Sequence, residues 1–278
     1  MVLKLLAYLA LYSAVAIMLS VYPPDVLSIA AVAIGAAVTY AAARCGGRFE
    51  RRVTSVYASL AWSSCMLLVF FVTMFTISSG LDVAPFLLYV LFVLLGVSLA
   101  AVVGAKDYRA VMQSVSLRYA ALGALLGIVV AWAAYAVPIS VVPVVGVSTP
   151  ALDVVTCVFV LMLYLVAIPE EFMGRVFAFH VGATTVDLAS ASVAAAVLGY
   201  ALHAITRYPA FGVLALVTVV WSLVTAFYAY TRSLVGAVLF HAVYNTVVTL
   251  MFSYGVLPVF IPSLVVAAAL AVYIARGG

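Results

Sequence analysis

Residues 154–183 read VVTCVFVLMLYLVAIPEEFMGRVFAFHVGA. The run is apolar over a length that crosses ~30 Å of hydrocarbon as an α-helix. Its interior nevertheless carries Pro169, Glu170, Glu171, Arg175 and His180. A charge at bilayer depth is costly unless it is paired or hydrated, so such residues mark a functional site by default. This stretch therefore predicts both the kind of fold and the place where the chemistry lies.

Apolar stretches of similar length recur along the whole chain. Of the 278 residues, 69% are hydrophobic and 7% are charged, whereas soluble domains carry about 25% charged residues. Helices satisfy their own backbone hydrogen bonds in lipid, and the stretches are too long and too continuous for the strands of a membrane β-barrel. We predict an all-α, polytopic transmembrane helical bundle, multi-pass in the cell membrane.

About ten spans are expected from the apolar stretches and from the proline, glycine and charged breaks between them. They are Leu5–Val21, Val26–Ala43, Val53–Ile77, Val83–Val103, Tyr119–Val137, Val154–Ala183, Leu188–Tyr208, Phe211–Tyr230, Leu234–Tyr254 and Val259–Ile274. With a cytoplasmic N-terminus, all of the 12 Lys and Arg residues except Arg207 fall on the cytoplasmic side. This bias predicts that both termini are inside, and it assigns the net charge of +4 to membrane orientation rather than to nucleic-acid binding.

The spacing of the ionisable residues predicts which of them share a helix face. Glu171 and Arg175 are four residues apart, which favours an ion pair one turn apart. Glu170 points about 100° away and is left to face something else. His241 and Asn245 are again four residues apart, on one face of a later span.

His203 follows a stripe of small residues at four-residue spacing, Ala191, Ala195 and Gly199, which lets a neighbouring helix approach closely. Glu170 and His203 can meet only if the chain between them turns midway, between positions 186 and 187. The polar segment 182–187 lies there, with Asp187 as a suitable N-cap for the next helix.

Taken together, Glu-Glu-x-x-x-Arg at 170–175, a helix ending in x-x-x-His at 203 and His-x-x-x-Asn at 241–245 resemble the CAAX protease and bacteriocin-processing family. These are intramembrane endopeptidases that include the type II CAAX prenyl proteases. The resemblance covers Val154–Tyr254. It implies a single membrane domain over residues 1–278, with accessory helices in 1–150 and the catalytic core in 154–254.

By motif position, the resemblance implies that Glu170 is the general base that activates water, assisted by His203. His241 and Asn245 would donate hydrogen bonds to the oxyanion of the tetrahedral intermediate, each worth ~3 kcal/mol in a water-excluded site. Glu171 and Arg175 would hold the helix that carries the base. The substrate would be a membrane-associated peptide or protein, and prenylated CAAX-type peptides are the family's best-known target.

Two points qualify the resemblance. The family's second motif is usually Phe-x-x-x-His, and here Gly199 stands at the Phe position, which removes an aromatic wall but keeps the histidine. Two histidines and a glutamate also form the ligand set of a catalytic zinc site. A zincin His-Glu-x-x-His helix is absent from the sequence, so we expect no required cofactor and no metal, with zinc as the alternative.

Other interpretations of the same residues stay open. Buried Glu and His residues also serve as proton relays in transporters, although no internal repeat is evident. The chain could also be a proteolytically silent scaffold, or the polar residues could merely fix helix register. His180 matches no motif and is interpreted as a helix-end or interfacial histidine, and Trp221 as belt or core. Substrate, side of entry and oligomeric state have no signal in the sequence.

Overall fold

The computed structural model describes residues 2–46, 89–98, 116–136, 150–205 and 211–276. These residues are helical, with no strand in the described ranges, as predicted. Seven of the described helical runs are long and apolar enough to cross a membrane. The predicted span Val53–Ile77 lies outside the described residues, and Val83–Val103 is described only as the helix Tyr89–Ser98. The total of ten spans therefore stays a prediction.

The chain divides into two compact units, each discontinuous in sequence. Unit 1 comprises residues 1–112 and 168–232, and unit 2 comprises residues 113–167 and 233–278. The helices of unit 1 are α1 (Val2–Val21), α2 (Val26–Cys45), Tyr89–Ser98, α7 (Ile168–Glu171), η2 (Phe172–Val181), α8 (Gly182–Thr185), α9 (Leu188–Ile205) and α10 (Phe211–Thr231). Those of unit 2 are α5 (Leu117–Ala136), α6 (Leu152–Leu161), η1 (Met162–Ala167), α11 (Leu234–Tyr254) and α12 (Val256–Ala275).

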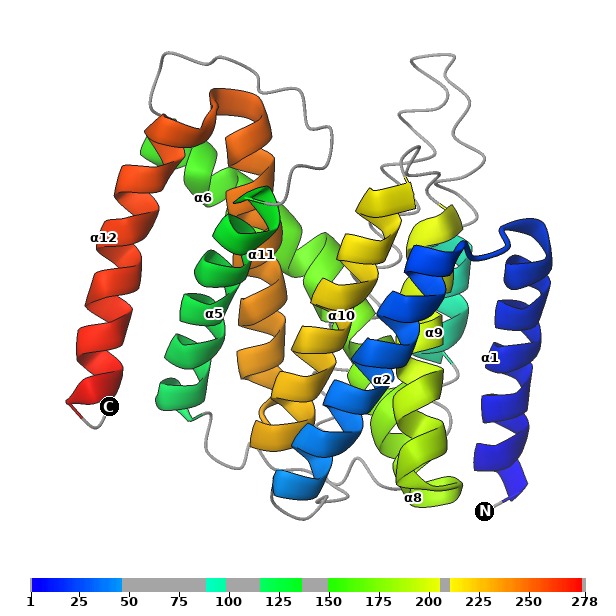
Figure 1. Ribbon diagram of the computed structural model, residues 1–278. Coiled ribbons are helices and arrows are strands. Elements are labelled where there is room, and N and C mark those ends of the chain that lie inside the picture. The colour runs from blue at the N-terminus through cyan, green and yellow to red at the C-terminus, as the bar shows by residue number, and fades with distance from the viewer. Residues whose placement is uncertain (1, 47–88, 99–115, 137–149, 206–210, 277–278) are drawn as a thin grey trace. The chain divides into compact units, whose positions relative to one another are not determined.

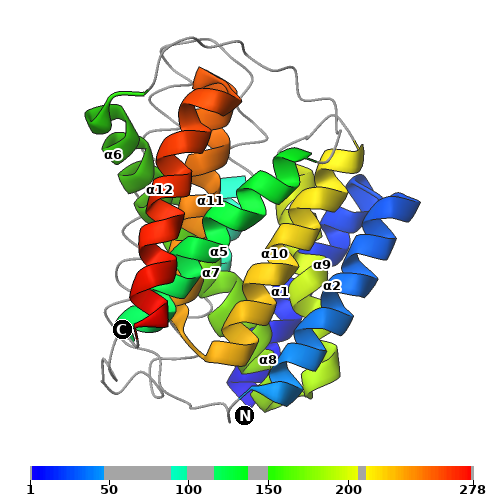
Figure 2. The same cartoon turned by 60° about the vertical axis from the view of Figure 1, so that its left-hand side comes forward.

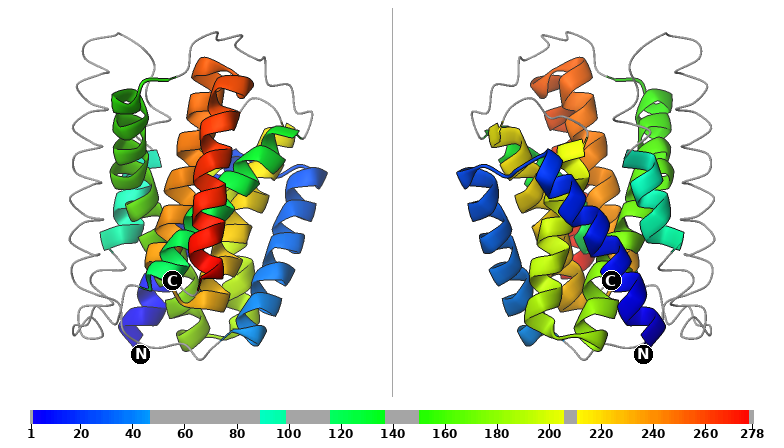
Figure 3. Two further views of the ribbon diagram at one scale, coloured as in Figure 1. Left: turned by 90° about the vertical axis from the view of Figure 1, so that its left-hand side faces the viewer. Right: turned by 90° about the vertical axis from the view of Figure 1, so that its right-hand side faces the viewer.

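Unit 1 is built around α2, α9 and α10, which pack side by side (Figure 1). Gly35 of α2 allows close contact, because a methyl group there would lie 2.1 Å from Oγ of Ser222 on α10. Thr39 Oγ1 also donates to the Ser222 carbonyl at 3.4 Å. Helix α1 lies against α8 and α9 (Figure 3), and its Tyr8 hydroxyl donates to the carbonyl of Ala178 in η2 at 3.4 Å.

Unit 2 places α5 against both α11 and α12 (Figure 2). A methyl group at Gly123 would lie 2.0 Å from the Gly236 carbonyl oxygen, so the α5 and α11 backbones nearly touch. On α12, Ser263 Oγ accepts a hydrogen bond from Trp132 Nε1 at 3.0 Å, and the Phe260 ring packs edge-on against Trp132 with a centroid distance of 4.4 Å. Small residues and one tryptophan thus hold the three helices together.

The helix ends follow the polar and glycine residues of the sequence. Asp25 follows the Pro23-Pro24 break and accepts from the Ser28 amide at 2.7 Å, and Ser233 accepts from the Gly236 amide at 3.1 Å. Gly255, with φ 85°, ends α11. Helix α12 then begins at Val256 rather than at the predicted Val259. Pro258 is tolerated there because the first-turn amides of a helix have no intrahelical partner.

Large apolar side chains face outward on several helices, with Val26 81% and Leu257 73% exposed. A helix whose outer face is as apolar as its core is stable in hydrocarbon rather than in water. The chain is therefore a multi-pass membrane protein.

Candidate active site

The helical run from Leu152 to Thr185 is interrupted on both sides of the two glutamates. Residues 162–167 and 172–181 form π-helical turns, and the short α7 between them carries Pro169, Glu170 and Glu171. Proline has no amide to donate to the turn before it, which relaxes the ladder of backbone hydrogen bonds. π-Helical turns inside α-helices occur frequently at functional sites, and here they flank the residues that the sequence analysis singled out.

The predicted ion pair between Glu171 and Arg175 is confirmed. Arg175 Nε lies 2.9 Å from Glu171 Oε2, and both side chains are fully buried. Arg175 also donates through Nη2 to the Trp221 carbonyl at 3.1 Å. The guanidinium charge is thus held by a carboxylate and a carbonyl inside the core of unit 1, which is what a buried charge requires.

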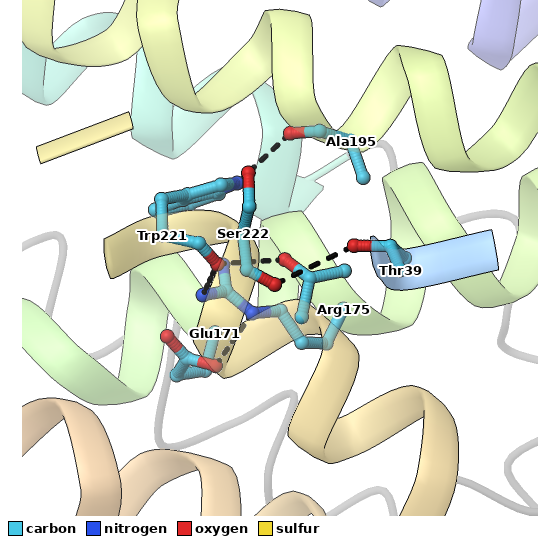
Figure 4. A network of polar contacts seen from close by, with 7 residues as sticks. Thr39, Glu171, Arg175, Ala195, Trp221 and Ser222 are labelled. Carbon is cyan, nitrogen blue, oxygen red and sulfur yellow. Dashed lines mark hydrogen bonds and ion pairs between the residues drawn. The ribbon is translucent and has the colours of Figure 1, made fainter. Parts of the chain in front are cut away.

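Trp221 is the centre of this polar network (Figure 4). Its ring lies under the Arg175 guanidinium, with Cζ 3.9 Å from the ring centroid. Its Nε1 donates to the Ala195 carbonyl of α9 at 2.8 Å. One residue of α10 therefore links η2 and α9 through a cation–π contact and hydrogen bonds.

Two glycines make room for this indole ring. A methyl group at Gly174 would lie 2.4 Å from Trp221 Cζ2, and one at Gly199 would lie 2.3 Å from Cδ1. Gly199 stands where the related motif usually has phenylalanine. At this position the aromatic ring comes from α10 instead of from α9, and Trp221 occupies the space that a larger side chain at 199 would need.

His203 lies at the end of α9, on the same side as this ring. Its Nδ1 is 2.7 Å from the Gly199 carbonyl, and its ring packs edge-on against Trp221 with a centroid distance of 5.8 Å. A carbonyl only accepts, so Nδ1 carries a proton, and in the neutral form of the imidazole Nε2 is then the acceptor or base nitrogen. The backbone of α9 thus fixes the tautomer that a catalytic histidine needs.

Glu170 is almost completely buried, with 2% of its surface exposed. Its Oε1 accepts a hydrogen bond from the hydroxyl of Tyr89, which belongs to the helix Tyr89–Ser98. Glu170 and Glu171 therefore have different partners, as their 100° separation predicts: Glu171 binds Arg175, and Glu170 binds a phenol from another helix.

The hairpin between η2 and α9 turns at Val186 and Asp187, where the midpoint argument predicted it. Asp187 caps α9, since its Oδ1 accepts from the Ser190 amide at 2.8 Å and its Oδ2 from the Ser190 hydroxyl at 2.6 Å. These two hydrogen bonds lower the pKa of the exposed Asp187 carboxyl. Behind the turn, Ala191 and Ala195 are fully buried, so the small-residue stripe is a close-packed face.

His241 and Asn245 belong to unit 2, where they lie one turn apart on α11. His241 is buried and Asn245 is half-buried. Gly127 of α5 packs on a different face of α11, since a methyl group there would lie 2.6 Å from the Phe240 carbonyl oxygen. Unit 1 thus carries Glu170, Glu171, Arg175 and His203, and unit 2 carries His241 and Asn245.

Within neither unit do three His, Cys, Asp or Glu side chains of the described residues gather as a metal-ion ligand set. His180 is buried and lies in the last turn of η2, which fits the predicted helix-end position and not the interfacial one. The two partners that sequence reasoning missed are Tyr89 and Trp221. Neither belongs to a short motif. Tyr89 contacts Glu170, which is 81 residues away in the chain, and Trp221 contacts Arg175, which is 46 residues away.

Comparison with known proteins gives one match. Residues 151–247 match the family model described as type II CAAX prenyl endopeptidase Rce1-like, a segment that contains all six of the predicted site residues. The comparisons with curated proteins and with solved structures each returned no match. Over residues 151–247 the chain is therefore similar to the type II CAAX prenyl endopeptidase Rce1-like family, which is consistent with the CAAX protease group that the three motifs resemble.

Proposed function

We propose that this protein is an intramembrane endopeptidase that hydrolyses a peptide bond of a membrane-associated substrate, with Glu170 as the base. The observation that carries the proposal is the contrast between two adjacent glutamates. Glu171 is engaged by Arg175, whereas Glu170 is buried nearby and held by a neutral phenol. A buried carboxylate that a hydrogen bond holds in place can accept a proton from water.

In this mechanism Glu170 takes a proton from a water molecule as the water oxygen attacks the peptide carbonyl carbon. The resulting tetrahedral intermediate carries a negative oxygen, which His241 and Asn245 stabilise as hydrogen-bond donors. Collapse of the intermediate breaks the C–N bond, and the proton held by Glu170 passes to the departing amine. The net reaction consumes one water molecule and one peptide bond and forms a new carboxyl group and a new amine.

His203 assists through Nε2, the nitrogen that its bond to the Gly199 carbonyl leaves as acceptor. In this role it accepts a hydrogen bond from the attacking water and orients it toward the substrate. Arg175 and Glu171 contribute by keeping η2 in register with α9 and α10 through Trp221. They act on the structure of the site rather than on the substrate.

The same donor set also suits zinc, because Glu170, His203 and His241 offer carboxylate oxygen and imidazole nitrogen. Bound there, zinc would supply a water of lowered pKa. We propose that the reaction needs no metal. Activity after exhaustive treatment with a chelator distinguishes the two cases.

The proposed substrate is a prenylated CAAX-type peptide, which the family description favours. We also propose that the protein lies in the cell membrane with ten spans and with both termini in the cytoplasm. Cysteine labelling from either side of sealed vesicles tests that topology. The substrate partner would be another membrane-anchored chain, with no nucleic acid involved.

The test uses purified protein in lipid nanodiscs, treated with chelator, and a panel of prenylated and unprenylated peptides followed by mass spectrometry. The variants are Glu170→Gln and a matched control, Asp187→Asn, which also neutralises a carboxylate but keeps a capping side chain at α9. We expect cleavage by the native protein and by Asp187→Asn, and loss of cleavage in Glu170→Gln. Cleavage by Glu170→Gln at the native rate would refute the proposal, and no cleavage by any form would favour a transporter or a silent scaffold.

A further inference from the structure

We propose that Tyr89 is a positioning residue for Glu170, supplied by a helix that lies outside the matched segment 151–247. The proposal rests on the proposed role of Glu170 as the base. It extends the site to the N-terminal part of the chain, which shares no motif with the family and was expected to be accessory.

Two contacts on one face hold the helix Tyr89–Ser98 against the segment that carries the base. The Tyr89 hydroxyl donates to Glu170 Oε1. Seven residues later, on the same helix face, Gly96 lies against Met173, where an added methyl group would be 2.3 Å from the sulfur. Met173 is in turn three residues after Glu170 and so lies on the same side of its helix. The helix is thus fixed at two points, and the phenol is one of them.

The burial pattern shows that this face is a core contact rather than a surface one. Tyr89 is 9% exposed and Val93 1% exposed, while Leu91 and Leu95 form the outward stripe at 58% and 41%. A phenol that is buried in an apolar core usually finds a hydrogen-bond partner, because an unsatisfied hydroxyl is costly there. The partner in this case is the carboxylate at the centre of the site.

The phenol suits a positioning role for chemical reasons. It keeps its proton at neutral pH and donates to an ionised carboxylate without cancelling the charge. A donor on Oε1 fixes the rotation of the carboxylate, and the orientation of a base decides whether it reaches the proton that it accepts. Arg175 interacts electrostatically with both Glu171 and Glu170, and neither Arg175 nor Glu171 is changed when Tyr89 is altered.

The first experiment compares Tyr89→Phe with Tyr200→Phe. Tyr200 is equally buried, at 3% exposed, and its hydroxyl donates to the Tyr22 carbonyl at 3.2 Å, away from the base. Both changes keep the ring and remove one hydrogen bond, which is buried at Tyr89 and partly buried at Tyr200. For Tyr89→Phe we expect kcat to fall about tenfold with KM nearly unchanged, as the loss of one hydrogen bond to a charged group predicts. Tyr200→Phe should change neither kcat nor KM.

A second readout does not depend on turnover. Infrared titration follows the carboxylic C=O band that disappears in Glu170→Gln. In Tyr89→Phe that band should lie at higher wavenumber than in the native protein, because the hydrogen-bond donor to the carboxyl oxygen is gone.

The outcomes separate the two proposals. Suppose that Glu170→Gln is inactive but that Tyr89→Phe matches Tyr200→Phe in kinetics and in the infrared band. This result overturns the role of Tyr89 and leaves the proposed base intact. An active Glu170→Gln overturns the proposed base. The infrared band remains informative if Glu170→Gln is active and also if no peptide is cleaved by any form. A shift of the band in Tyr89→Phe supports the contact between Tyr89 and the Glu170 carboxyl, and an unchanged band refutes it.

Discussion

The guanidinium of Arg175 lies 3.9 Å from the centre of the Trp221 ring, while its nitrogens bind the Glu171 carboxylate and the Trp221 carbonyl. Three contacts of different kinds thus converge on one fully buried cation. Planarity and a fork of donors are needed to make all three at once, and arginine has both whereas lysine has neither.

We therefore predict that Arg175→Lys destabilises the protein although the charge is kept. A lysine can pair with Glu171 or reach the Trp221 carbonyl, but it cannot do both and also stack on the ring. Removing one partner of a buried pair costs about 3–5 kcal/mol, and Arg175→Lys should approach the lower end. Thermal unfolding in detergent measures the effect, with Arg276→Lys at the exposed end of α12 as the control. Equal melting temperatures for both variants would contradict the network.

A second prediction concerns the glycine at the position where the related motif has phenylalanine. Gly199→Phe should be strongly destabilising, by about 3 kcal/mol or more, because the new ring and Trp221 compete for one space. In a Trp221→Ala background the same change should cost far less, so that the two substitutions are non-additive in a double-mutant cycle. Additive losses of stability would show that Trp221 does not fill the space beside position 199.

A third prediction separates the two nitrogens of His203. Asparagine places its amide nitrogen near the position of Nδ1 and can still donate to the Gly199 carbonyl, but it has nothing at the position of Nε2. We expect His203→Asn to fold with a near-native melting temperature and to lose about 100-fold or more in kcat, the usual scale for an acid–base group. Near-native turnover would exclude a catalytic role for Nε2. His180→Asn, which alters the buried histidine of unit 1, serves as the comparison.

A fourth prediction follows from the cap of α9. Its hydrogen bonds to Ser190 lower the pKa of Asp187, so the ionised form is preferred in the folded protein. The stabilising effect of Asp187 is present above the unfolded-state pKa near 3.8 and is lost as the pH falls through the lower folded-state value. Hydrogen exchange over residues 186–192 should be faster in Asp187→Ala than in the native protein at pH 6, with Asp187→Asn in between. If the difference in exchange rate between Asp187→Ala and the native protein were as large below the folded-state pKa as at pH 6, the ionised carboxylate would not be the source of the stabilisation.

The parts of the site that the sequence predicted are those set by local spacing. The Glu171–Arg175 pair, the cap at Asp187 and the turn at 186–187 all depend on residues a few positions apart, where helix geometry fixes the distance. Membrane helices were equally predictable, because apolar length alone decides them.

The contacts that the sequence did not predict are between distant helices. Nothing in the pattern around Tyr89 distinguishes it from the other tyrosines of the chain, and its partner is 81 residues away. For Trp221 the sequence predicts only a belt or core position, because one aromatic residue in an apolar span does not reveal which helices it joins. Gly174 and Gly199 are the residues that indicate this contact, since small residues in two spans leave room for a large side chain from a third.

The most direct test of the central claim is the cleavage rate of chelator-treated protein in nanodiscs, measured on the best prenylated peptide of the panel for the native chain and for Glu170→Gln. We expect the native protein to cleave the peptide at one bond and Glu170→Gln to be slower by about 100-fold or more, with an unchanged melting temperature. Equal rates for the two forms would contradict a base at Glu170.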